Sequence, residues 1–297
     1  MRVESSPSRA GPALRWSVEQ RLAFIEARLF WLGHVNRTDL VTRFGVSMSQ
    51  ASNDIARYLA LAPPGLAYDK SVKRYVAGPG FRPVLAPPDA VRFLGELQLI
   101  ELGILSPAEA TLGGVPPFDG APLPRRAVDA YVLRAVLAGM RERRAVSVLY
   151  QSMSRPAPMR RTIEPHALAH DGFRWHARAF DHETRTFRDF VLGRMRQARA
   201  AGPATARPED DAEWHRWVPL RIAPHPALTP AQAKAIRLDY GIAGAAATLR
   251  VRQSLLFYAL RRLGLDTAPG SRPPQEQHIV LVNRDEVMPL VSRQPEA

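Results

Sequence analysis

The 297-residue chain contains no cysteine. Disulfide bonds and thiolate metal sites are therefore excluded. Lysine is almost missing as well, because it occurs only at Lys70, Lys73 and Lys234, and arginine carries nearly all of the positive charge. No apolar run approaches the roughly 20 residues of a membrane span, and the segment up to Trp16 lacks the apolar centre of a signal peptide. We expect a soluble, cytoplasmic protein without a metal or a cofactor.

The net positive charge of the chain points to a polyanionic partner. The formal net charge is +13, which favours nucleic acid over a membrane surface. A GC-rich genome alone would also enrich arginine, alanine and proline, so the placement of the charge carries more weight than its total. A chain of this length can form two or three domains, each with its own core.

Segments rich in proline and glycine divide the chain. They lie at residues 62–65, 78–88, 113–124 and 202–211. Such residues favour turns and irregular backbone. The stretches between these segments differ in apolar periodicity, and no stretch repeats another, so we expect units of different structure.

The first stretch predicts three helices. Apolar residues recur at a spacing of three or four over 18–32, after the N-cap residue Ser17. Asn36 can cap a short second helix, which Gly45 can end in the left-handed conformation. The sequence from Ser47 to Gln50 matches a capping box and opens a third helix.

Two helices joined by a tight glycine-containing turn form a helix-turn-helix, whose second helix can enter the major groove. On that helix the apolar residues share one side, and side chains that can bond to bases or phosphates lie on the other. Strands at 66–69 and 73–76 would add a basic wing. The predicted DNA-binding residues are Ser47, Ser49, Gln50, Ser52, Asn53 and Arg57 on the helix and Lys70, Lys73 and Arg74 on the wing.

A generic three-helix bundle with a solvated polar face is the alternative for this unit. The charge weighs against it, because residues 1–80 hold 11 Lys and Arg against 6 acids, a net charge of +5. Residues 81–140 predict mainly helices, with apolar spacing at 91–105 and 128–137. We expect this segment to act as a linker and to pack against partners.

Residues 141–200 combine short alternating strands with the densest positive charge. Alternation predicts strands at 146–150, 162–168, 173–179 and 188–194. On the third strand Trp175 has the parity of the core, where we expect it to pack and not to serve as a base-stacking platform. Arg174, His176 and Arg178 share the opposite face. In this segment 13 arginines stand against 6 acids, a net charge of +7. Because guanidinium groups bind phosphate bidentately, we expect a small barrel with a pocket for an anion.

Four segments of this region resemble the successive motifs of WYL domains. They are Tyr150-Gln-Ser152-Met-Ser154, Ile163-Glu164-Pro165-His166, residues 173–180 and residues 187–195. Their order and spacing are more specific than any one motif. In that family an Sm-like, SH3-type barrel follows a winged helix-turn-helix in bacterial transcriptional regulators. The resemblance implies a ligand sensor for nucleic acid or nucleotides.

The resemblance also implies which residues bind the ligand. The pocket positions are Tyr150, Ser152, His166, Arg188 and Arg194, with Arg174 and Arg178 as additions. One departure concerns the Trp-Tyr-Leu triplet that names the family, which stands here as Trp175-His176-Ala177. Roles that depend on the tyrosine and leucine side chains, and the identity of the ligand, are therefore not carried over.

The last stretch predicts an α+β domain. We expect strands at 217–223, 248–252 and 278–283, with helices at 229–240 and 254–263. Pro224-His225-Pro226, Asp239-Tyr240-Gly241 and residues 251–258 resemble the C-terminal domain that accompanies WYL regulators. The whole chain is similar to the dimeric repressors found beside BREX- and CBASS-type anti-phage defence genes.

An enzymatic reading has little support in the sequence. His166 and His170 have the spacing of metal ligands on a helix, but Pro165 and the strand-like context argue against a helix. No nucleophile elbow, P-loop or dinucleotide-binding motif is present. The second hypothesis is a nucleic-acid-processing enzyme or nuclease accessory whose basic barrel holds a single strand. Metal-dependent cleavage that depends on His166 or His170 would favour it.

Together these patterns predict an α+β multidomain protein with four units. Residues 1–80 form a winged helix-turn-helix, 81–140 a helical linker, 141–202 a WYL barrel and 203–297 an α+β dimerisation domain. The predicted function is a homodimeric, sequence-specific repressor of an anti-phage defence operon, relieved or modulated by an anionic nucleic-acid or nucleotide ligand in the WYL domain. Its partners would be an inverted-repeat DNA operator, a second copy and an anionic effector, with no membrane and no catalytic site.

Overall fold

The computed structural model describes residues 18–111, 114–121, 124, 126–268 and 270–291. The chain divides into two compact units, Met1–Leu123 and Pro124–Ala297, and each unit is described by itself. The predicted cap Ser17 lies outside the described residues. No helix in the described part of the chain is long and apolar enough to cross a membrane.

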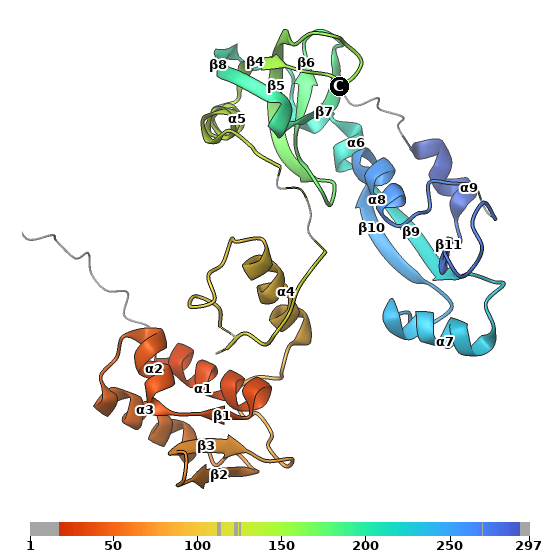
Figure 1. Ribbon diagram of the computed structural model, residues 1–297. Helices are drawn as coiled ribbons and strands as arrows, with labels where there is room; N and C mark the ends of the chain where they lie inside the picture. The colour runs from red at the N-terminus through yellow and green to blue at the C-terminus, as the bar shows by residue number, and fades with distance from the viewer. Residues whose placement is uncertain (1–17, 112–113, 122–123, 125, 269, 292–297) are drawn as a thin grey trace, which may run out of the picture. The chain divides into compact units, whose positions relative to one another are not determined.

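The first unit contains the three predicted helices, of which α2 and α3 form the predicted helix-turn-helix (Figure 1). They are α1 (Val18–Leu32), α2 (Arg37–Phe44) and α3 (Met48–Ala60). The Asn36 side chain accepts from the Asp39 backbone N at 3.0 Å, and the Asp39 carboxylate accepts from the Asn36 backbone N at 2.7 Å. Gly45 has φ 63°, a left-handed conformation that glycine adopts without strain. These start and stop positions confirm the sequence prediction.

A three-stranded antiparallel sheet completes the winged helix. Its order is β1 (His34–Val35), β3 (Arg74–Ala77) and β2 (Leu66–Asp69), and β2 and β3 confirm the predicted wing. The two residues of β1 are too few to show a periodicity, so this strand was not predicted. Ile25, Leu40 and Tyr58 are fully buried in the core between the helices.

One buried carboxylate fastens the segment that follows the wing. Glu26 of α1 accepts hydrogen bonds from the Tyr58 hydroxyl at 2.9 Å and from the Val84 backbone N at 2.6 Å, and also from the next two backbone N–H groups. The segment leads into α4 (Ala90–Glu101), which begins at its N-cap Asp89. This helix belongs to the first compact unit, whereas α5 (Ala130–Glu142) belongs to the second.

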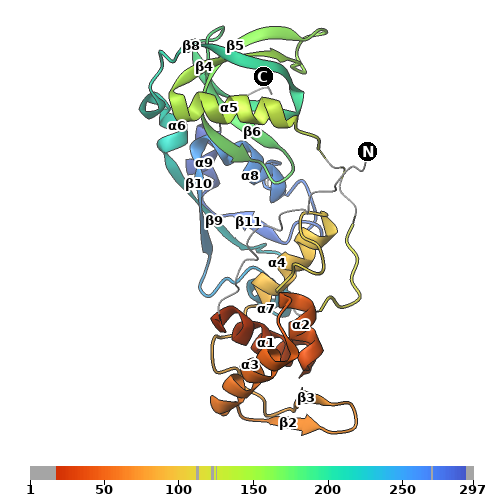
Figure 2. The ribbon, with the colours of Figure 1, turned by 90° about the vertical axis from the view of Figure 1, so that its left-hand side faces the viewer.

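The second unit begins with a five-stranded antiparallel sheet. Its strands are β4 (Arg144–Tyr150), β5 (Met159–His170), β6 (Trp175–Asp181), β7 (Thr186–Val191) and β8 (Met195–Pro203). Figure 2 shows α5 running across one face of this sheet. A Cβ atom at Gly139 of α5 would lie 2.6 Å from Cγ2 of Val146, so glycine permits the close approach. Val132 and Val136 of the helix complete this core.

The predicted closed barrel is not confirmed. The strand order is β7-β6-β5-β4-β8, and no hydrogen-bonded ladder joins β7 to β8 within the described residues. A single 3-10 turn, η1 (Leu192–Arg194), connects these two edge strands. The strand β8 was not predicted, because Met195–Pro203 contains no β-branched or aromatic residue. Pairing with β4 imposes the extended conformation.

The C-terminal part contains a second sheet of order β10-β9-β11. It comprises β9 (Trp217–Pro224), β10 (Ala247–Arg252) and β11 (Ile279–Leu281), the last shorter than predicted. Its helices are α6 (Ala212–His215), α7 (Pro230–Asp239), α8 (Leu256–Arg262) and α9 (Arg284–Val287). The capping box of Thr229 and Gln232 at the start of α7 is confirmed. The helices α6 and α9, each four residues long, were not predicted.

Candidate DNA-binding helix and effector site

The N-terminus of α3 is open to solvent. The Ser47 side chain accepts a hydrogen bond from the Gln50 backbone N at 3.1 Å. The reciprocal half of the predicted capping box is missing, because Gln50 Nε2 instead donates to Asp54 Oδ1 at 2.9 Å. Ser47 and Ser49 are exposed beside the first backbone N–H groups of the helix. These groups and the helix dipole favour a phosphate at this position.

The outward side of α3 has the predicted polar character. Ala51 and Tyr58 are fully buried, whereas Asn53 and Arg57 are exposed one helical turn apart. The Ser52 hydroxyl is half-buried and donates its proton to the Met48 backbone carbonyl at 2.9 Å. The hydroxyl oxygen can still accept a hydrogen bond from a ligand. A helix with this surface can present amide and guanidinium groups to base edges.

A buried ion pair fixes the rotation of α3 about its axis. Arg21 Nε of α1 donates to Asp54 Oδ2 at 2.6 Å, and Asp54 is fully buried. The same carboxylate accepts from Gln50. Because Arg21 of α1 holds the Asp54 side of α3, the neighbouring positions Asn53 and Arg57 stay exposed.

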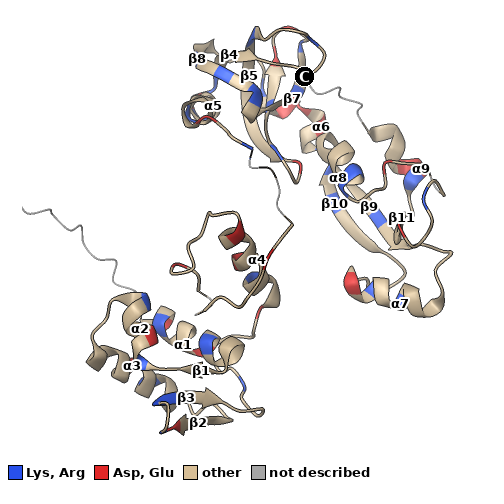
Figure 3. Cartoon of the chain, in the orientation of Figure 1, with Lys and Arg blue, Asp and Glu red and all other residues tan. Residues whose placement is uncertain are grey.

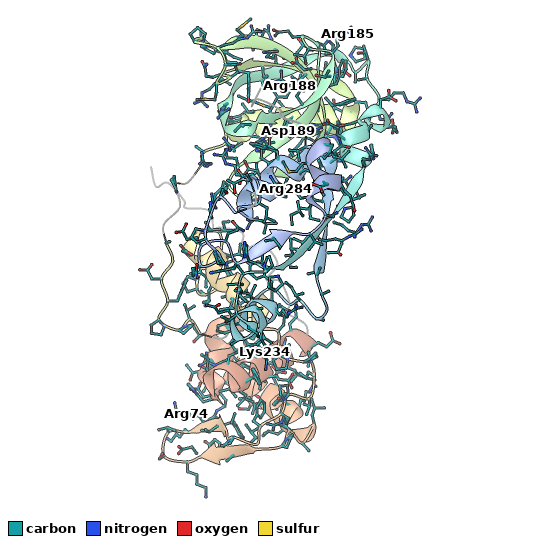
Figure 4. The ribbon with its side chains drawn as sticks, turned by 90° about the vertical axis from the view of Figure 1, so that its right-hand side faces the viewer. Arg74, Arg185, Arg188, Asp189, Lys234 and Arg284 are labelled. Atoms are coloured by element: carbon teal, nitrogen blue, oxygen red, sulfur yellow. The ribbon has the colours of Figure 1, made fainter. Side chains whose placement is uncertain are left out.

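The turn of the wing carries the predicted basic residues. Lys70 and Lys73 are exposed there, and Arg74 is half-buried on β3 (Figure 4). Hydrogen bonds from the Ser71 hydroxyl and backbone N to Asp69 lower the pKa of that carboxyl below its ordinary value. The Asp69 carboxylate thereby holds the turn in which Lys73 adopts φ 52°. The wing tip therefore offers cations near α3 within one compact unit.

The structure divides the predicted effector residues between two faces of the five-stranded sheet. Arg178 pairs with Asp189 across β6 and β7, and the adjacent pair is Ala179 with Arg188. Consecutive residues of a strand point to opposite faces, so Arg178 and Arg188 lie on opposite sides. The sequence resemblance placed them in one pocket.

The first set comprises residues at the end of β4, on β7 and in η1. Tyr150 is buried with its ring 5.2 Å from that of Phe190, and its hydroxyl accepts from the Val191 backbone N at 3.2 Å. Arg188 is half-buried and shares the face of Phe190 on β7. The chain from η1 returns to this end, because the Gln151 backbone N donates to the Arg194 carbonyl at 3.3 Å.

Ser152 lies at the same end of β4. It is buried, and its hydroxyl lies 3.1 Å from that of Ser154. Tyr150 and Ser152 thus contribute hydroxyl groups, while Arg188 and Arg194 contribute guanidinium groups. These chemical groups suit an oxyanion.

The second set forms a buried ionic cluster, which we name the Arg178 cluster (Arg178, Asp189, Asp211 and Glu213). Arg178 is 1% exposed. Its Nε and Nη2 atoms donate to the two Asp211 oxygens at 2.7 and 2.8 Å, and Nη2 also donates to Glu213 at 3.0 Å. Asp189 lies 3.5 Å from Nη1. Three acids therefore surround one guanidinium, which links the five-stranded sheet to α6.

In the Arg178 cluster the pKa of Asp211 is lowered and that of Asp189 is raised. Burial opposes the charge on Asp211, but hydrogen bonds from Arg178 and His166 outweigh it and lower the pKa of that carboxyl. Burial raises the pKa of Asp189, and its attraction to Arg178 only partly offsets this. His166 contributes through Nε2, which lies 2.9 Å from Asp211 Oδ2. The predicted residues His166 and Arg178 are thus bonded to acids of the protein itself.

His176, which replaces the tyrosine of the family triplet, takes part in a neighbouring network. His176 is 1% exposed, with Nε2 lying 3.0 Å from Asp171 Oδ2 and its ring 5.1 Å from that of Tyr258 on α8. Arg174 precedes β6 in a turn, where its Nε donates to the same Asp171 oxygen at 3.1 Å. Burial opposes the charge on Asp171, but hydrogen bonds from His176 and from the backbone of the turn lower its pKa.

The prediction that Trp175 packs in the core is wrong. The side chain is 49% exposed, and its ring lies 4.7 Å from that of His170, its partner across the strand pair. This pair lies at the far end of the β5–β6 hairpin, beyond the pairs that β6 makes with β7. The hairpin therefore extends beyond the hydrophobic core. A residue at this end is exposed even when the alternation of the strand places it on the core side.

Sequence reasoning missed the acids that neutralise Arg178. The pairing of Asp189 with Arg178 was predictable, because counting residues outward from the predicted turn at 181–186 makes the two cross-strand partners. Asp211 was assigned to a break between domains, although it caps α6 by accepting from the Trp214 backbone N at 3.2 Å. Tyr258, whose hydroxyl donates to Asp189 at 3.3 Å, gave no signal in the sequence.

Three family models match the chain. The BrxR transcriptional regulator winged helix-turn-helix domain matches residues 17–99, the WYL domain residues 131–200, and the BrxR transcriptional regulator C-terminal dimerization domain residues 217–287. Together they span the helix α3, both sets of effector residues and the second sheet.

Full-length relatives are named DNA-binding transcriptional repressor CapW. The protein from Stenotrophomonas maltophilia is 40% identical over 288 residues, covering 96% of this chain and 95% of its own. That from Pseudomonas aeruginosa is 36% identical, covering 96% and 95%. That from Escherichia coli (strain KTE188) is 37% identical, covering 94% and 93%.

Among solved structures, proteasome accessory factor B/C (PafBC) of Arthrobacter aurescens aligns over 97% of this chain and 51% of its own, with 16% identity and a TM-score of 0.26. The chain thus spans about half the length of that protein.

Proposed function

The chain belongs to the family of BrxR and CapW transcriptional regulators, in which a winged helix-turn-helix, a WYL domain and a C-terminal dimerisation domain are combined. From this premise we propose that it is a homodimeric, sequence-specific DNA-binding repressor. Relatives that match almost its whole length carry the name of a repressor and not of an enzyme. A repressor works where the chromosome is, in the cytoplasm.

The observation that carries this proposal is the exposed polar face of α3. The buried pair of Arg21 and Asp54 fixes the helix, and the exposed side carries Asn53 and Arg57. In our proposal these two side chains read base edges in the major groove, while Ser47, Ser49 and the wing lysines hold phosphates. Gln50 and Ser52, which already bond within the helix, orient that face.

The effector site of this proposal is the first set of sheet residues. Tyr150, Ser152, Arg188 and Arg194 would hold an anionic group of a nucleotide or a short nucleic acid. The second set, which includes His166, Arg174 and Arg178, is bonded to Asp171 and Asp211. In our proposal it stabilises the sheet and its junction with the C-terminal domain, because its donors already serve carboxylates of the protein.

The strand β7 joins the two sets. Arg188 lies on the face of the effector site, and Asp189 contacts Arg178 on the other face and Tyr258 of α8. An anion that moves Arg188 therefore acts on the strand that holds the C-terminal domain. An effector changes the population of two states only through such differential contacts.

The helix α7 is the surface we propose for pairing with a second copy. None of its residues is buried, and Leu238 is 76% exposed. An isolated helix of ten residues is marginal in water, so a helix without buried residues gains stability from a partner. The matched dimerization model, residues 217–287, includes this helix.

The proposed target is the operator of an anti-phage defence operon, read as an inverted repeat by the two-fold symmetric dimer. A footprint on the DNA upstream of the protein's own gene tests the proposal. We expect protection of two half-sites separated by one or two helical turns. Protection no stronger than on random duplex would refute sequence-specific repression.

A further inference from the structure

The first compact unit contains a cavity beside the helix-turn-helix. Its volume is about 280 Å³, and α1, α2, α4 and the segment 83–89 contribute its walls. All of these elements belong to the same compact unit. Small-molecule sites in proteins have volumes of about 300–1,000 Å³, so this cavity suits a small metabolite. The buried carboxylate of Glu26, which fastens the segment after the wing, is part of the same wall.

Five aromatic side chains line the cavity. They are Phe24, Phe30 and Trp31 of α1, Phe44 of α2 and Phe93 of α4. The rings of Phe24 and Phe44 meet edge to face, with their centres 5.1 Å apart. The ring centres of Trp31 and Phe93 are 4.6 Å apart. Because these contacts hold the rings in place, an apolar ligand finds walls that are already ordered.

The surroundings of the cavity are acidic in an otherwise basic chain. Residues 83–121 contain five acids and one arginine, a net charge of −4, whereas the whole chain has a net charge of +13. Figure 3 shows acidic positions along α4 and in the loops around it. This region therefore repels the phosphates of DNA and attracts a cation.

The charged side chains of the wall also favour a cation over an anion. The side chain of Glu96 is 12% exposed, whereas that of its partner Arg92, 3.5 Å away, is 67% exposed. Water and salt screen the exposed guanidinium more than the buried carboxylate. The two Nη atoms of Arg43 donate to the backbone carbonyls of Ala108 and Glu109, at 2.8 and 2.6 Å. The charge of Glu96 is therefore the least compensated at this wall.

We propose that this cavity binds a small organic cation with an apolar body, as a site separate from the exposed face of α3 and from the effector residues. The class comprises amines and quaternary ammonium compounds that carry an aromatic ring or a short hydrocarbon chain. Cations are attracted to the faces of aromatic rings, and the Glu96 carboxylate beside those rings adds to the attraction. The proposal does not depend on the repressor function.

A second copy of the chain fits this cavity poorly. A two-fold contact places the same surface on both partners, so the acids of one copy would face those of the other, which is unfavourable. A small cation has the complementary charge and reaches walls formed by α1 and α4. Because it binds the folded unit and not the unfolded chain, it raises the melting temperature of that unit.

The test is calorimetric titration of the full chain with three probes of similar size, 2-phenylethylammonium, 2-phenylethanol and phenylacetate. We expect the ammonium to bind, the alcohol to bind at least about fivefold more weakly, and phenylacetate to show no binding. Glu96→Gln should weaken binding of the ammonium to the level of the alcohol and change the affinity for the alcohol less than twofold. Glu101→Gln, at an exposed position of the same helix, is the matched control and should change neither affinity.

A variant that fills the cavity tests where the probe binds. Ala27 of α1 lines the cavity, so Ala27→Phe should abolish binding of the ammonium. Circular dichroism and the melting temperature check that this variant is folded. Glu96→Gln, which removes a charge with little change of shape, tests the site independently of Ala27→Phe.

Three outcomes would overturn the proposal. The first is a wild-type protein that does not bind 2-phenylethylammonium at millimolar concentration. The second is equal affinity for the ammonium and the alcohol, which would assign the cavity to a neutral ligand. The third is an unchanged affinity for the ammonium in Glu96→Gln and in folded Ala27→Phe, which would place the bound probe elsewhere on the chain.

Discussion

Arg188 and Asp189 are consecutive residues of β7 whose side chains lie on opposite faces of the same sheet (Figure 4). Asp189 is 4% exposed and contacts Arg178 and Tyr258, whereas Arg188 is half-buried on the face of the sheet that carries Phe190. One peptide unit thus separates the proposed effector contact from the junction with the C-terminal domain. Because the two contacts are so close, an anion bound to Arg188 could change the arrangement of the dimer and its affinity for DNA.

Replacement of Arg57 by alanine should weaken operator binding. Loss of a guanidinium that contacts a base costs about 1–3 kcal/mol, roughly a fivefold to 150-fold rise in Kd. The melting temperature should stay unchanged, because Arg57 is exposed. Arg134→Ala, an exposed arginine on α5, is the control. Equal affinities of the two variants in a gel-shift titration would remove Arg57 from the interface.

Replacement of Arg188 or Arg194 by alanine should spare operator binding and abolish the response to an effector. Each variant removes a guanidinium on which the anion depends. The measurement is operator affinity with and without 5′-phosphorylated oligonucleotides or nucleotides that shift the wild-type protein. Arg196→Ala, an exposed arginine on β8, should respond as the wild type does. A full response by Arg188→Ala would exclude this pocket.

Asp211→Ala should destabilise the second unit strongly. Removing one partner of a buried ion pair leaves the other charge uncompensated and costs about 3–5 kcal/mol. Glu213→Ala should cost much less, because the Glu213 side chain is 32% exposed. Urea unfolding measures both. Similar midpoints for the two variants would show that Arg178 does not depend on Asp211.

The pKa of Asp211 is lowered in the folded protein. This determines the direction in which its contribution to the free energy of unfolding changes with pH. Its contribution to stability is complete above the ordinary carboxyl pKa of about 3.9, and it is lost as the pH falls through the lower folded value. Asp211→Asn should remove this acid-dependent part of the free energy of unfolding. An unchanged acid slope would contradict the assignment.

Asp189 should have the opposite pH dependence, because burial raises its pKa. A carboxyl group whose pKa is higher in the folded protein than in the unfolded one contributes to stability at low pH. The protein loses this contribution as the pH rises from the ordinary value of about 3.9 through the folded value. Asp189→Asn keeps the shape but cannot ionise, so thermal unfolding of this variant should lack that fall. A fall of the same size in both proteins would mean that another group titrates.

Leu238→Glu should convert the proposed dimer into a monomer. Burying a carboxylate in an apolar contact is unfavourable, and Leu238 is 76% exposed in the single chain, so the fold itself should tolerate the change. Tyr131→Glu, at a side chain that is 80% exposed on α5, is the matched control. Light scattering that finds a dimer in both variants would place the pairing surface away from α7.

The sequence predicted those elements whose information is local. The capping pair of Asn36 and Asp39, the left-handed Gly45 and the capping box at Thr229 are each read within a few residues, and each is confirmed. The strand β8 depends on pairing with β4 and has no local signal. Trp175 has the right parity for the core but lies beyond it.

The site was harder to predict than the fold, for a related reason. The sequence places Arg178 and Arg188 in one basic region, but it does not show which acids reach them. Asp211 comes from a different element, and its bonds to Arg178 and His166 make part of the expected pocket a structural cluster. Net charge over a segment therefore overstates the number of cations that are available to a ligand.

The most direct test of the account is a gel-shift titration of the purified protein on the DNA upstream of its own gene, with random duplex as the competitor. The account predicts a complex that survives the competitor, that has the stoichiometry of one dimer per inverted repeat, and that Arg57→Ala weakens at least about fivefold. A complex lost to the competitor at the same rate in the wild type and in Arg57→Ala would contradict a repressor that reads DNA through α3.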